Sequence, residues 1–158
     1  MIVMGVDPGL ARVGIGVVRG GAGPAVSLGY ECITSSGRGR TASERLAGIY
    51  DRLLALFERF GPDELAVEQL FFARNVTSAM GVAEVRGVVL LAAGKRGLPV
   101  AEYTPNQVKL AVTGSGKADK RQVQEMIARL LGLPGVPEPD DAADALAIAL
   151  CHLHTRGE

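Results

Sequence analysis

M-I-V-M-G-V-D-P-G-L-A-R-V-G-I-G-V-V, from Met1 to Val18, is the stretch that decides the fold. Its first six residues form a short apolar run of the kind found in buried strands. The run stops at Asp7, and the Pro-Gly pair that follows indicates a turn. Val13 to Val18 then has the composition of a second strand. The chain therefore opens with two strands that are expected to pair antiparallel, with an acidic side chain at the end of the first.

Beyond this stretch, the apolar periodicity predicts a third strand and then helices that alternate with strands. Three strands in a meander, followed by this alternation, predict an α/β fold. We expect a mixed sheet, with parallel strands added to the antiparallel meander and helices on both faces. No repeat or linker is evident in the 158 residues, so one domain over residues 1–158 is expected. The expected elements are a third strand over Val26 to Thr34, a helix over Thr41 to Phe60, a strand over Glu64 to Glu68, a helix over Asn75 to Gly94, a strand over Leu98 to Tyr103, a helix from Thr104-Pro105, and helices over Lys120 to Leu131 and Asp140 to His154.

The composition is that of an ordinary globular protein, with 47% hydrophobic and 22% charged residues. No uninterrupted apolar run approaches the roughly 20 residues that span a bilayer, so no membrane association is expected. No basic stretch precedes an apolar segment at the N-terminus, so no signal peptide is evident. The two cysteines, Cys32 and Cys151, are far apart and not in metal-ligand spacing, so a reduced cytoplasmic protein is expected.

The net charge is zero, with 17 basic and 17 acidic residues, and does not by itself indicate a nucleic-acid-binding protein. The charges are nevertheless segregated along the chain. Between Lys109 and Arg129 there are five basic and two acidic residues, whereas Glu138 to Asp144 holds four acids and no base. This distribution fits a protein that contacts phosphates with one surface and metal with another, although two solvated patches of opposite charge would also produce it.

Four acidic residues lie where burial is expected. Asp7 and Glu68 each follow a buried strand, so both carboxylates emerge at one edge of the sheet if those strands are neighbours. Asp141 and Asp144 are three residues apart on one face of the last helix, whose other residues are mostly alanine, leucine and isoleucine. Burying unpaired carboxylates costs several kcal/mol each, so a bound cation is the expected compensation.

Helix capping is an alternative for part of this cluster, since Asp140 or Asp141 could cap the last helix. Capping does not explain Asp144, which lies about a turn inside the helix. Oxygen-only ligands favour Mg²⁺, with Mn²⁺ as a substitute. Clustered carboxylates without His or Cys match phosphodiester hydrolysis with two metal ions per site, which activate water and stabilise the leaving 3′ oxygen.

Three acidic motifs and one basic segment closely resemble the RuvC-type Holliday junction resolvases, a family of the ribonuclease H-like superfamily. The motifs are G-V-D-P-G-L-A-R-V-G at Gly5 to Gly14, A-V-E-Q-L-F-F at Ala66 to Phe72 and D-A-A-D-A-L-A-I-A-L at Asp141 to Leu150, and the basic segment runs from Pro105 to Gln124. The resemblance covers essentially the whole chain. It implies a crossover junction endodeoxyribonuclease of recombination and DNA repair. Such an enzyme acts as a homodimer that nicks two strands of a four-way DNA junction symmetrically, with the RuvA–RuvB branch-migration complex as a possible partner.

By position, the resemblance makes Asp7, Glu68, Asp141 and Asp144 the catalytic, metal-binding acids. Some relatives carry histidine where Asp141 stands. Lys109 and Lys120 match lysines implicated in DNA contact, and Lys120 is also expected to assist catalysis, because an ammonium near the scissile phosphate stabilises developing charge. Solvated surface lysines are the alternative. The further residues expected to contact DNA are Lys117 and Arg121, although Lys117 has no comparably clear family match.

Phe71 matches a family aromatic residue that stacks on bases at the junction centre, an interaction worth about 1–3 kcal/mol per base. Phe72 is a further candidate for DNA contact, and a core position is the alternative for this aromatic pair. Arg74 and Asn75 continue the same loop and are expected to contact phosphate. The two histidines near the C-terminus, His152 and His154, are expected to be surface or boundary residues, because their spacing puts them on different helix faces.

Three other functions compete with junction cleavage. A nucleotide-binding phosphotransferase of the actin and sugar-kinase type has a similar D-x-G loop, but it needs two such domains and a second Gly-rich segment. A noncatalytic DNA-binding module would bind phosphate better without the four acids. A ribonuclease H acting on RNA–DNA hybrids shares the fold and the metals, while the phenylalanine pair and the basic segment favour the junction nuclease.

Overall fold

The computed structural model describes residues 1–34, 40–69 and 76–157. Within these residues, five strands and five helices follow one another in the order expected from the sequence, with boundaries that differ by a few residues. The strands are β1 (Ile2–Pro8), β2 (Arg12–Arg19), β3 (Val26–Thr34), β4 (Glu64–Glu68) and β5 (Val100–Tyr103). The helices are α1 (Ala42–Phe60), α2 (Val76–Lys95), α3 (Pro105–Thr113), α4 (Lys120–Leu130) and α5 (Asp140–Arg156).

The strands form one mixed sheet in the order β3-β2-β1-β4-β5. β1 pairs antiparallel with β2, and β2 pairs antiparallel with β3, which is the expected meander. β4 pairs parallel with β1, and β5 pairs parallel with β4. The predicted mixed sheet is therefore confirmed, and β1 and β4 lie side by side.

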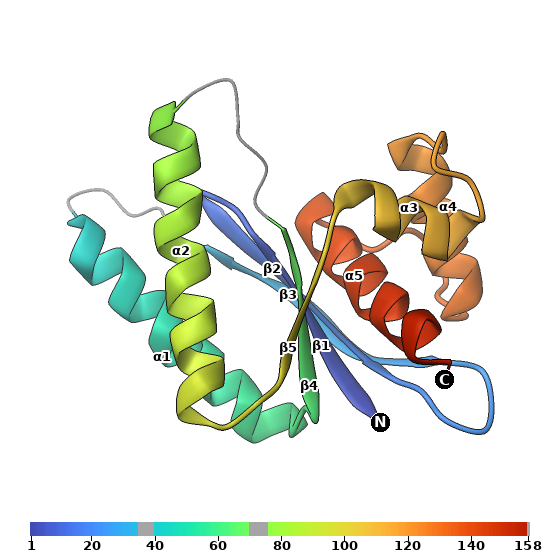
Figure 1. Cartoon of the computed structure of the whole chain (residues 1–158), viewed down its shortest axis with the longest axis horizontal. Coiled ribbons are helices and arrows are strands. Elements are labelled where there is room, and N and C mark those ends of the chain that lie inside the picture. Colours follow the sequence, from blue (N-terminus) through green and yellow to red (C-terminus); the bar gives the residue numbers. More distant parts are fainter. Residues whose placement is uncertain (35–39, 70–75, 158) are drawn as a thin grey trace.

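Helices cover both faces of the sheet (Figure 1). α1 and α2 pack together on one face, and their apolar side chains share a core with β1, β2 and β4. α5 lies on the other face across β1 and β2, and α3 and α4 pack against its outer side. The last helix is therefore enclosed between the sheet and another pair of helices, which explains its high content of small apolar residues.

Side chains and glycines mark the ends of several helices. Thr41 caps α1 through a hydrogen bond from the backbone N–H of Glu44, and Gly61 ends that helix with a φ of 56°. Thr104 and Asp119 each form a reciprocal capping box at the starts of α3 and α4. These local signals place the ends of the helices independently of the core.

α5 begins differently. Its N-cap residue is Pro139, and no side chain makes a capping hydrogen bond there. The interpretation of Asp140 or Asp141 as a helix cap is therefore wrong. Asp140 is the first residue of the helix, and its carboxylate instead accepts a hydrogen bond from Gln124 of α4 at 3.1 Å.

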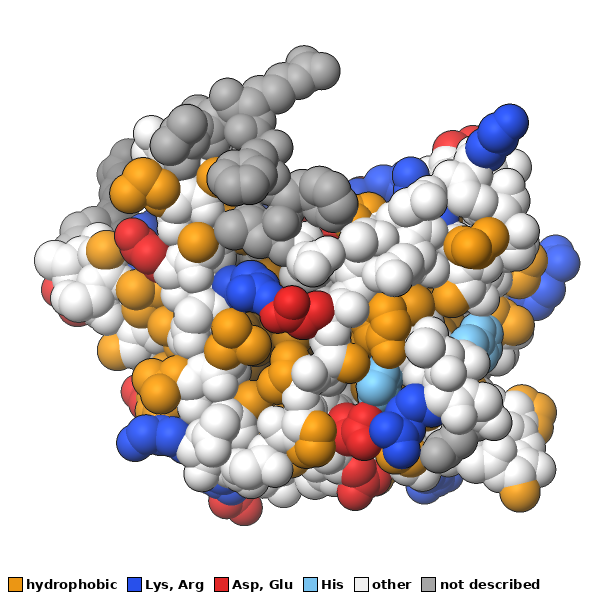
Figure 2. Space-filling view, viewed as in Figure 1, with side chains coloured by type: hydrophobic (Ala, Val, Ile, Leu, Met, Phe, Trp, Pro, Cys, Tyr) orange, Lys and Arg blue, Asp and Glu red, His pale blue; other side chains and the backbone are white. Residues whose placement is uncertain are grey.

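α2 combines a buried face with an exposed apolar surface. By length and composition alone, its residues Thr77–Lys95 could cross a membrane, with a mean hydropathy of 1.3, although Glu84 and Arg86 interrupt the apolar run. Val85, Val89, Ala92 and Ala93 are buried in the core beside β1 and α1. Figure 2 shows hydrophobic side chains on the surface over this helix. Met80 is 61% exposed and Leu91 is 54% exposed.

His152 is a buried residue, contrary to the expectation of a surface or boundary position. It is only 4% exposed, and its Nε2 lies 2.5 Å from an oxygen of Glu64 at the start of β4. Its Nδ1 lies 2.6 Å from the hydroxyl of Tyr103 on β5. These contacts join the end of α5 to the two parallel strands. His154 is exposed as expected, and its ring contacts a backbone carbonyl of α3.

Candidate active site

Two neighbouring strands bring Asp7 and Glu68 to the same edge of the sheet. Val6 of β1 is paired with Val67 of β4, so the two acids that come next lie beside each other. The apolar residues before them are fully buried, which holds the ends of both strands in place. This arrangement confirms the expected placement of the two carboxylates at the carboxyl ends of parallel strands.

α5 brings the other two acids to this edge because glycines allow it to lie directly on the sheet. A Cβ atom built on Gly14 of β2 would lie 1.9 Å from the carbonyl oxygen of Asp141, and one on Gly5 of β1 would lie 2.0 Å from the carbonyl oxygen of Ala145. Any side chain at either position would push the helix away from the strands. Because glycine has no side chain at these two positions, α5 lies close enough to the sheet to bring Asp141 and Asp144 near Asp7.

Three of the four predicted acids form a compact group. One carboxylate oxygen from each of Asp7, Asp141 and Asp144 lies within 4.8 Å of the others, and all three residues are half-buried. Glu68 completes the cluster from the side, because it shares a hydrogen bond with Asp7 and lines the same cavity as Asp144. The structure therefore brings all four predicted acids together.

Three of the four carboxylates, those of Asp7, Glu68 and Asp144, have raised pKa values. Burial, followed by the charge of Glu68, raises the pKa of Asp7 to about 8, and a protonated Asp7 donates a hydrogen bond to Glu68. Burial also raises the pKa of Glu68 and of Asp144, and neighbouring carboxylates add to both shifts. These shifts mean that nearby positive groups do not balance the negative charge of the carboxylates. Such an imbalance favours the binding of a cation.

Lys120 reaches this cluster from α4. It is the first residue of α4, and its Nζ lies 3.6 Å from a carboxylate oxygen of Asp144 and 3.4 Å from one of Asp140. Partial burial disfavours the ammonium, but the charges of Asp144 and Asp140 outweigh it and raise the pKa of Lys120. The side chain is therefore a fixed positive charge at the edge of the site.

The remaining basic residues of the segment fall into different environments. Lys109 lines a cavity of about 240 Å³ together with Glu68, Lys120 and Asp144, so it borders the acid cluster. Arg121 is 87% exposed and forms an ion pair with Glu125 at 2.9 Å on the outer side of α4. The structure thus places Lys109 at the site, whereas Arg121 lies on the exposed side of α4 beside an acidic neighbour.

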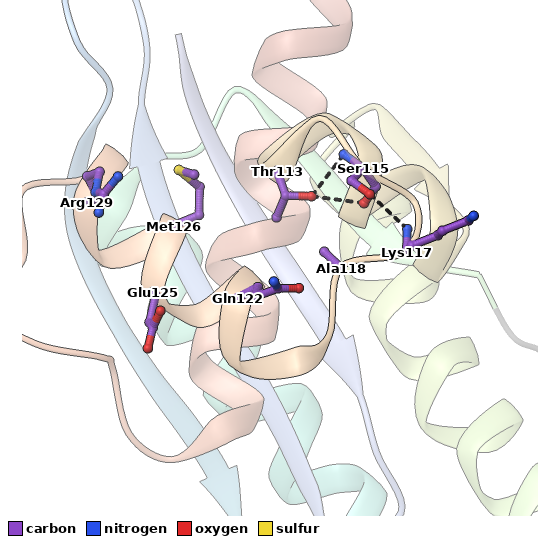
Figure 3. A pocket seen from close by; sticks show the side chains of 8 residues that line it. All are labelled: Thr113, Ser115, Lys117, Ala118, Gln122, Glu125, Met126 and Arg129. Carbon is purple, nitrogen blue, oxygen red and sulfur yellow. Dashed lines mark hydrogen bonds between the residues drawn. The ribbon is translucent and has the colours of Figure 1, made fainter.

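Lys117 belongs to a second hollow, of about 480 Å³, between the end of α3 and the outer face of α4. Its side chain extends away from Met126 and Arg129, which form the opposite wall (Figure 3). No member of the acid cluster lines this hollow. Lys117 is therefore separate from the carboxylates, and its expected contact with DNA stays a prediction.

The residues present fit a hard divalent cation. All the clustered donors are carboxylate oxygens, which are the ligands that Mg²⁺ and Mn²⁺ prefer. Burial and mutual repulsion raise the pKa of Asp7, Glu68 and Asp144, so positive charge placed among these carboxylates would be favourable. Asp7, Glu68, Asp141 and Asp144 are the residues that could hold it.

Phe71, Phe72, Arg74 and Asn75 lie outside the described residues, so their expected contacts with DNA stay predictions. Two contributors to the site were not singled out from the sequence. One is the glycine pattern of β2, where Gly14 and Gly16 alternate; glycine inside a strand can indicate a close backbone approach. The other is Asp140, for which no sequence pattern distinguishes a cap from a contact with α4.

Comparison with known proteins agrees with this geometry. Residues 3–152 match the family model described as crossover junction endodeoxyribonuclease RuvC. A crossover junction endodeoxyribonuclease RuvC from Moorella thermoacetica is 52% identical over 152 residues, covering 96% of this chain and 90% of the relative. The structure of T. thermophilus RuvC in complex with Holliday junction substrate superposes with a TM-score of 0.93 at 42% identity, covering 99% of this chain and 94% of that one.

A more distant structure, the yeast mitochondrial Holliday junction resolvase Ydc2, shares the fold, with a TM-score of 0.72 at 16% identity over 98% of this chain and 80% of that one. The family match and the relative extend over nearly the full length of the chain, and the matched residues 3–152 span the positions of all four acids. On this evidence the chain belongs to the RuvC family of crossover junction endodeoxyribonucleases.

Proposed function

We propose that this chain is a Holliday junction resolvase that uses its four clustered carboxylates to hold two Mg²⁺ ions and hydrolyse DNA phosphodiesters. The family to which it belongs consists of crossover junction endodeoxyribonucleases, which depend on divalent metal. The observation that carries the proposal is the convergence of three acids within 4.8 Å, with Glu68 bound to one of them. Mn²⁺, which accepts the same ligands, is the expected substitute.

Each residue of the site has a definite task in this mechanism. When two cations are bound, Asp7 of β1, Glu68 of β4 and the two α5 acids, Asp141 and Asp144, would hold them through their carboxylate oxygens. When bound, the ions supply activation of the attacking water and stabilisation of the leaving 3′ oxygen. Asp7 must lose its proton before it can act as a ligand, because its pKa is raised to about 8.

Two lysines contribute positive charge for the substrate. The ammonium of Lys120 is expected to stabilise the charge that develops on the scissile phosphate, since it lies at the edge of the carboxylate cluster. Lys109, in the same cavity, is expected to contact a neighbouring phosphate. Lys117, Arg121, Phe71, Phe72 and Arg74 are also expected to contact the junction.

The exposed apolar surface of α2 supports a homodimer in which each subunit cuts one strand. Met80 and Leu91 are more than half exposed on this helix, and Gly81 lies against Leu10 of the β1–β2 turn, itself 41% exposed. Large apolar side chains exposed on one helix are typical of faces that bind another subunit. Met80→Glu should yield monomers in light scattering and abolish paired nicking, whereas Leu110→Glu, at an exposed position on α3, should leave the dimer intact.

The interaction with the RuvA–RuvB complex and the cytoplasmic location stay predictions.

A cleavage assay on a synthetic mobile four-way junction tests the function. Paired symmetric nicks are expected with Mg²⁺ or Mn²⁺ and none with EDTA, while matched linear duplex and RNA–DNA hybrid should remain uncut. Asp7→Asn and Asp144→Asn should abolish nicking but keep most of the junction affinity. Asp51→Asn, on the exposed surface of α1, is the matched control and should cut normally.

Each alternative outcome has a distinct meaning. Cutting of the RNA–DNA hybrid in place of the junction would retain the metal site and change the substrate class. Junction binding without cutting under any metal would favour a noncatalytic binding module. Normal cutting by Asp7→Asn or Asp144→Asn would refute the four-acid site.

A further inference from the structure

Asp140 joins the first turns of α4 and α5 beside the active site, outside the acid cluster itself. One of its carboxylate oxygens accepts a hydrogen bond from Gln124 Nε2 at 3.1 Å, and the other lies 3.4 Å from Lys120 Nζ. Lys120 and Gln124 are four residues apart, so both point from the same face of α4. Because both of its oxygens are engaged, the carboxylate has a fixed orientation toward the ammonium.

The second partner of Lys120 is one of the proposed metal ligands. A carboxylate oxygen of Asp144 lies 3.6 Å from the ammonium, and Asp144 contributes one oxygen to the group of three acids within 4.8 Å. A cation bound there would share the charge of Asp144 and repel the ammonium at short range. In the metal-loaded enzyme, Asp144 would therefore hold Lys120 much less firmly than it does in the metal-free protein.

A bound cation would not weaken the ion pair of Asp140 with Lys120 in this way, because Asp140 is not one of the three acids within 4.8 Å. Lys120 has a 57% exposed side chain that would otherwise be free to turn into solvent. We propose that Asp140 is a positioning residue that, anchored by Gln124, keeps the Lys120 ammonium beside the carboxylate cluster once Asp144 is engaged by metal. This inference rests on the catalytic role of Lys120 in the proposed function.

The energetic contribution of the contact to folding is small. Asp140 has a 64% exposed side chain, and exposed ion pairs contribute about 0–1 kcal/mol to stability. The effect is expected in the rate of cleavage, because an ammonium that is displaced by a few ångströms no longer stabilises the phosphate charge. Removing a negative charge next to the substrate path should also tighten junction binding, so rate and affinity should change in opposite directions.

Single-turnover cleavage at saturating Mg²⁺, together with junction affinity in EDTA, tests the inference. Asp140→Ala should cut about tenfold more slowly, as is common when the partner of a site residue is removed, with equal or tighter junction binding. Asp140→Asn, which keeps the shape and the contact with Gln124, should also be slow. Glu138→Ala is the matched control, because Glu138 lines the same cleft, of about 700 Å³, without contacting Lys120; it should cut normally.

A double substitution identifies the route of the effect. If Asp140 acts through Lys120, Asp140→Ala should cause no further loss in a Lys120→Ala background. A fully additive loss, or single variants that cut as fast as Glu138→Ala or faster, would overturn the inference while leaving the proposed function in place. If Lys120→Ala itself cuts at the wild-type rate, the catalytic role of Lys120 fails, and the role of Asp140 fails with it.

Discussion

Replacing Gly14 by alanine tests whether the distance between α5 and the sheet controls catalysis. The new Cβ would lie 1.9 Å from the carbonyl oxygen of Asp141 and 2.5 Å from its carbonyl carbon. Ordinary van der Waals contact begins near 3.4 Å, so helix and strand must separate by about 1.5 Å. Both contacts involve backbone atoms, so no side-chain rotation can relieve them.

This displacement is large for a metal site and moderate for a folded core. Metal–ligand distances tolerate changes of about 0.2 Å, and a misplacement of about 1 Å can reduce a catalytic rate by about 100-fold. Overpacking of a core typically costs about 1–3 kcal/mol. Since about 1 kcal/mol lowers the Tm of a domain of this size by about 2–4 °C, the variant should still be folded at 25 °C.

The assay combines single-turnover junction cleavage, thermal melting and the Mg²⁺-induced increase in Tm. Gly14→Ala should cut at least about 100-fold more slowly and lose most of the increase in Tm. Gly48→Ala is the control: Gly48 lies on the exposed side of α1, where a Cβ would meet nothing within 4 Å, so only a gain in helix propensity of up to about 1 kcal/mol is expected. Wild-type cleavage and melting by Gly14→Ala would refute the argument.

Three further outcomes are expected. The raised pKa of Asp7 means that the metal-free fold binds this proton more tightly than the unfolded chain does, so its contribution to stability is complete below the ordinary value of 3.8 and is lost as pH rises through about 8. In EDTA, Asp7→Asn should therefore melt with a flatter pH profile than the wild type, and parallel profiles would contradict this. His152→Leu should lower the free energy of unfolding in urea by about 2 kcal/mol, because the Tyr103 hydroxyl and the Glu64 carboxylate each lose a hydrogen-bond partner, although Glu64 keeps its ion pair with Arg156. Exposed His154→Leu should cost less than about 1 kcal/mol. Lys109→Ala should weaken junction binding, measured by fluorescence anisotropy, and reduce the slope of log affinity against log salt by about 1. Arg121→Ala should change both quantities less, because Arg121 is paired with Glu125. Equal effects of the two substitutions would contradict the different roles of these residues.

Much of the architecture could be predicted from local sequence patterns. Apolar runs and helical periodicity identify strands and helices because each reflects which side of one element is buried. The placement of Asp7 and Glu68 immediately after buried strands predicted a common sheet edge, and the pairing of Val6 with Val67 confirms it. The spacing of Asp141 and Asp144 required only the helical repeat to place them on one face.

The sequence by itself thus determined the order of the elements, the chemistry of the acid cluster and the family. Only the tertiary structure decided how closely the acids approach, because that depends on where α5 lies across β1 and β2. Gly14 allows this close approach because it has no Cβ atom. Sequence periodicity carries no information about such a contact between segments far apart in the chain. Asp140 and His152 were misjudged for the same reason: their partners, Lys120 and Glu64, come from other elements, and long-range pairing is a property of the packed molecule.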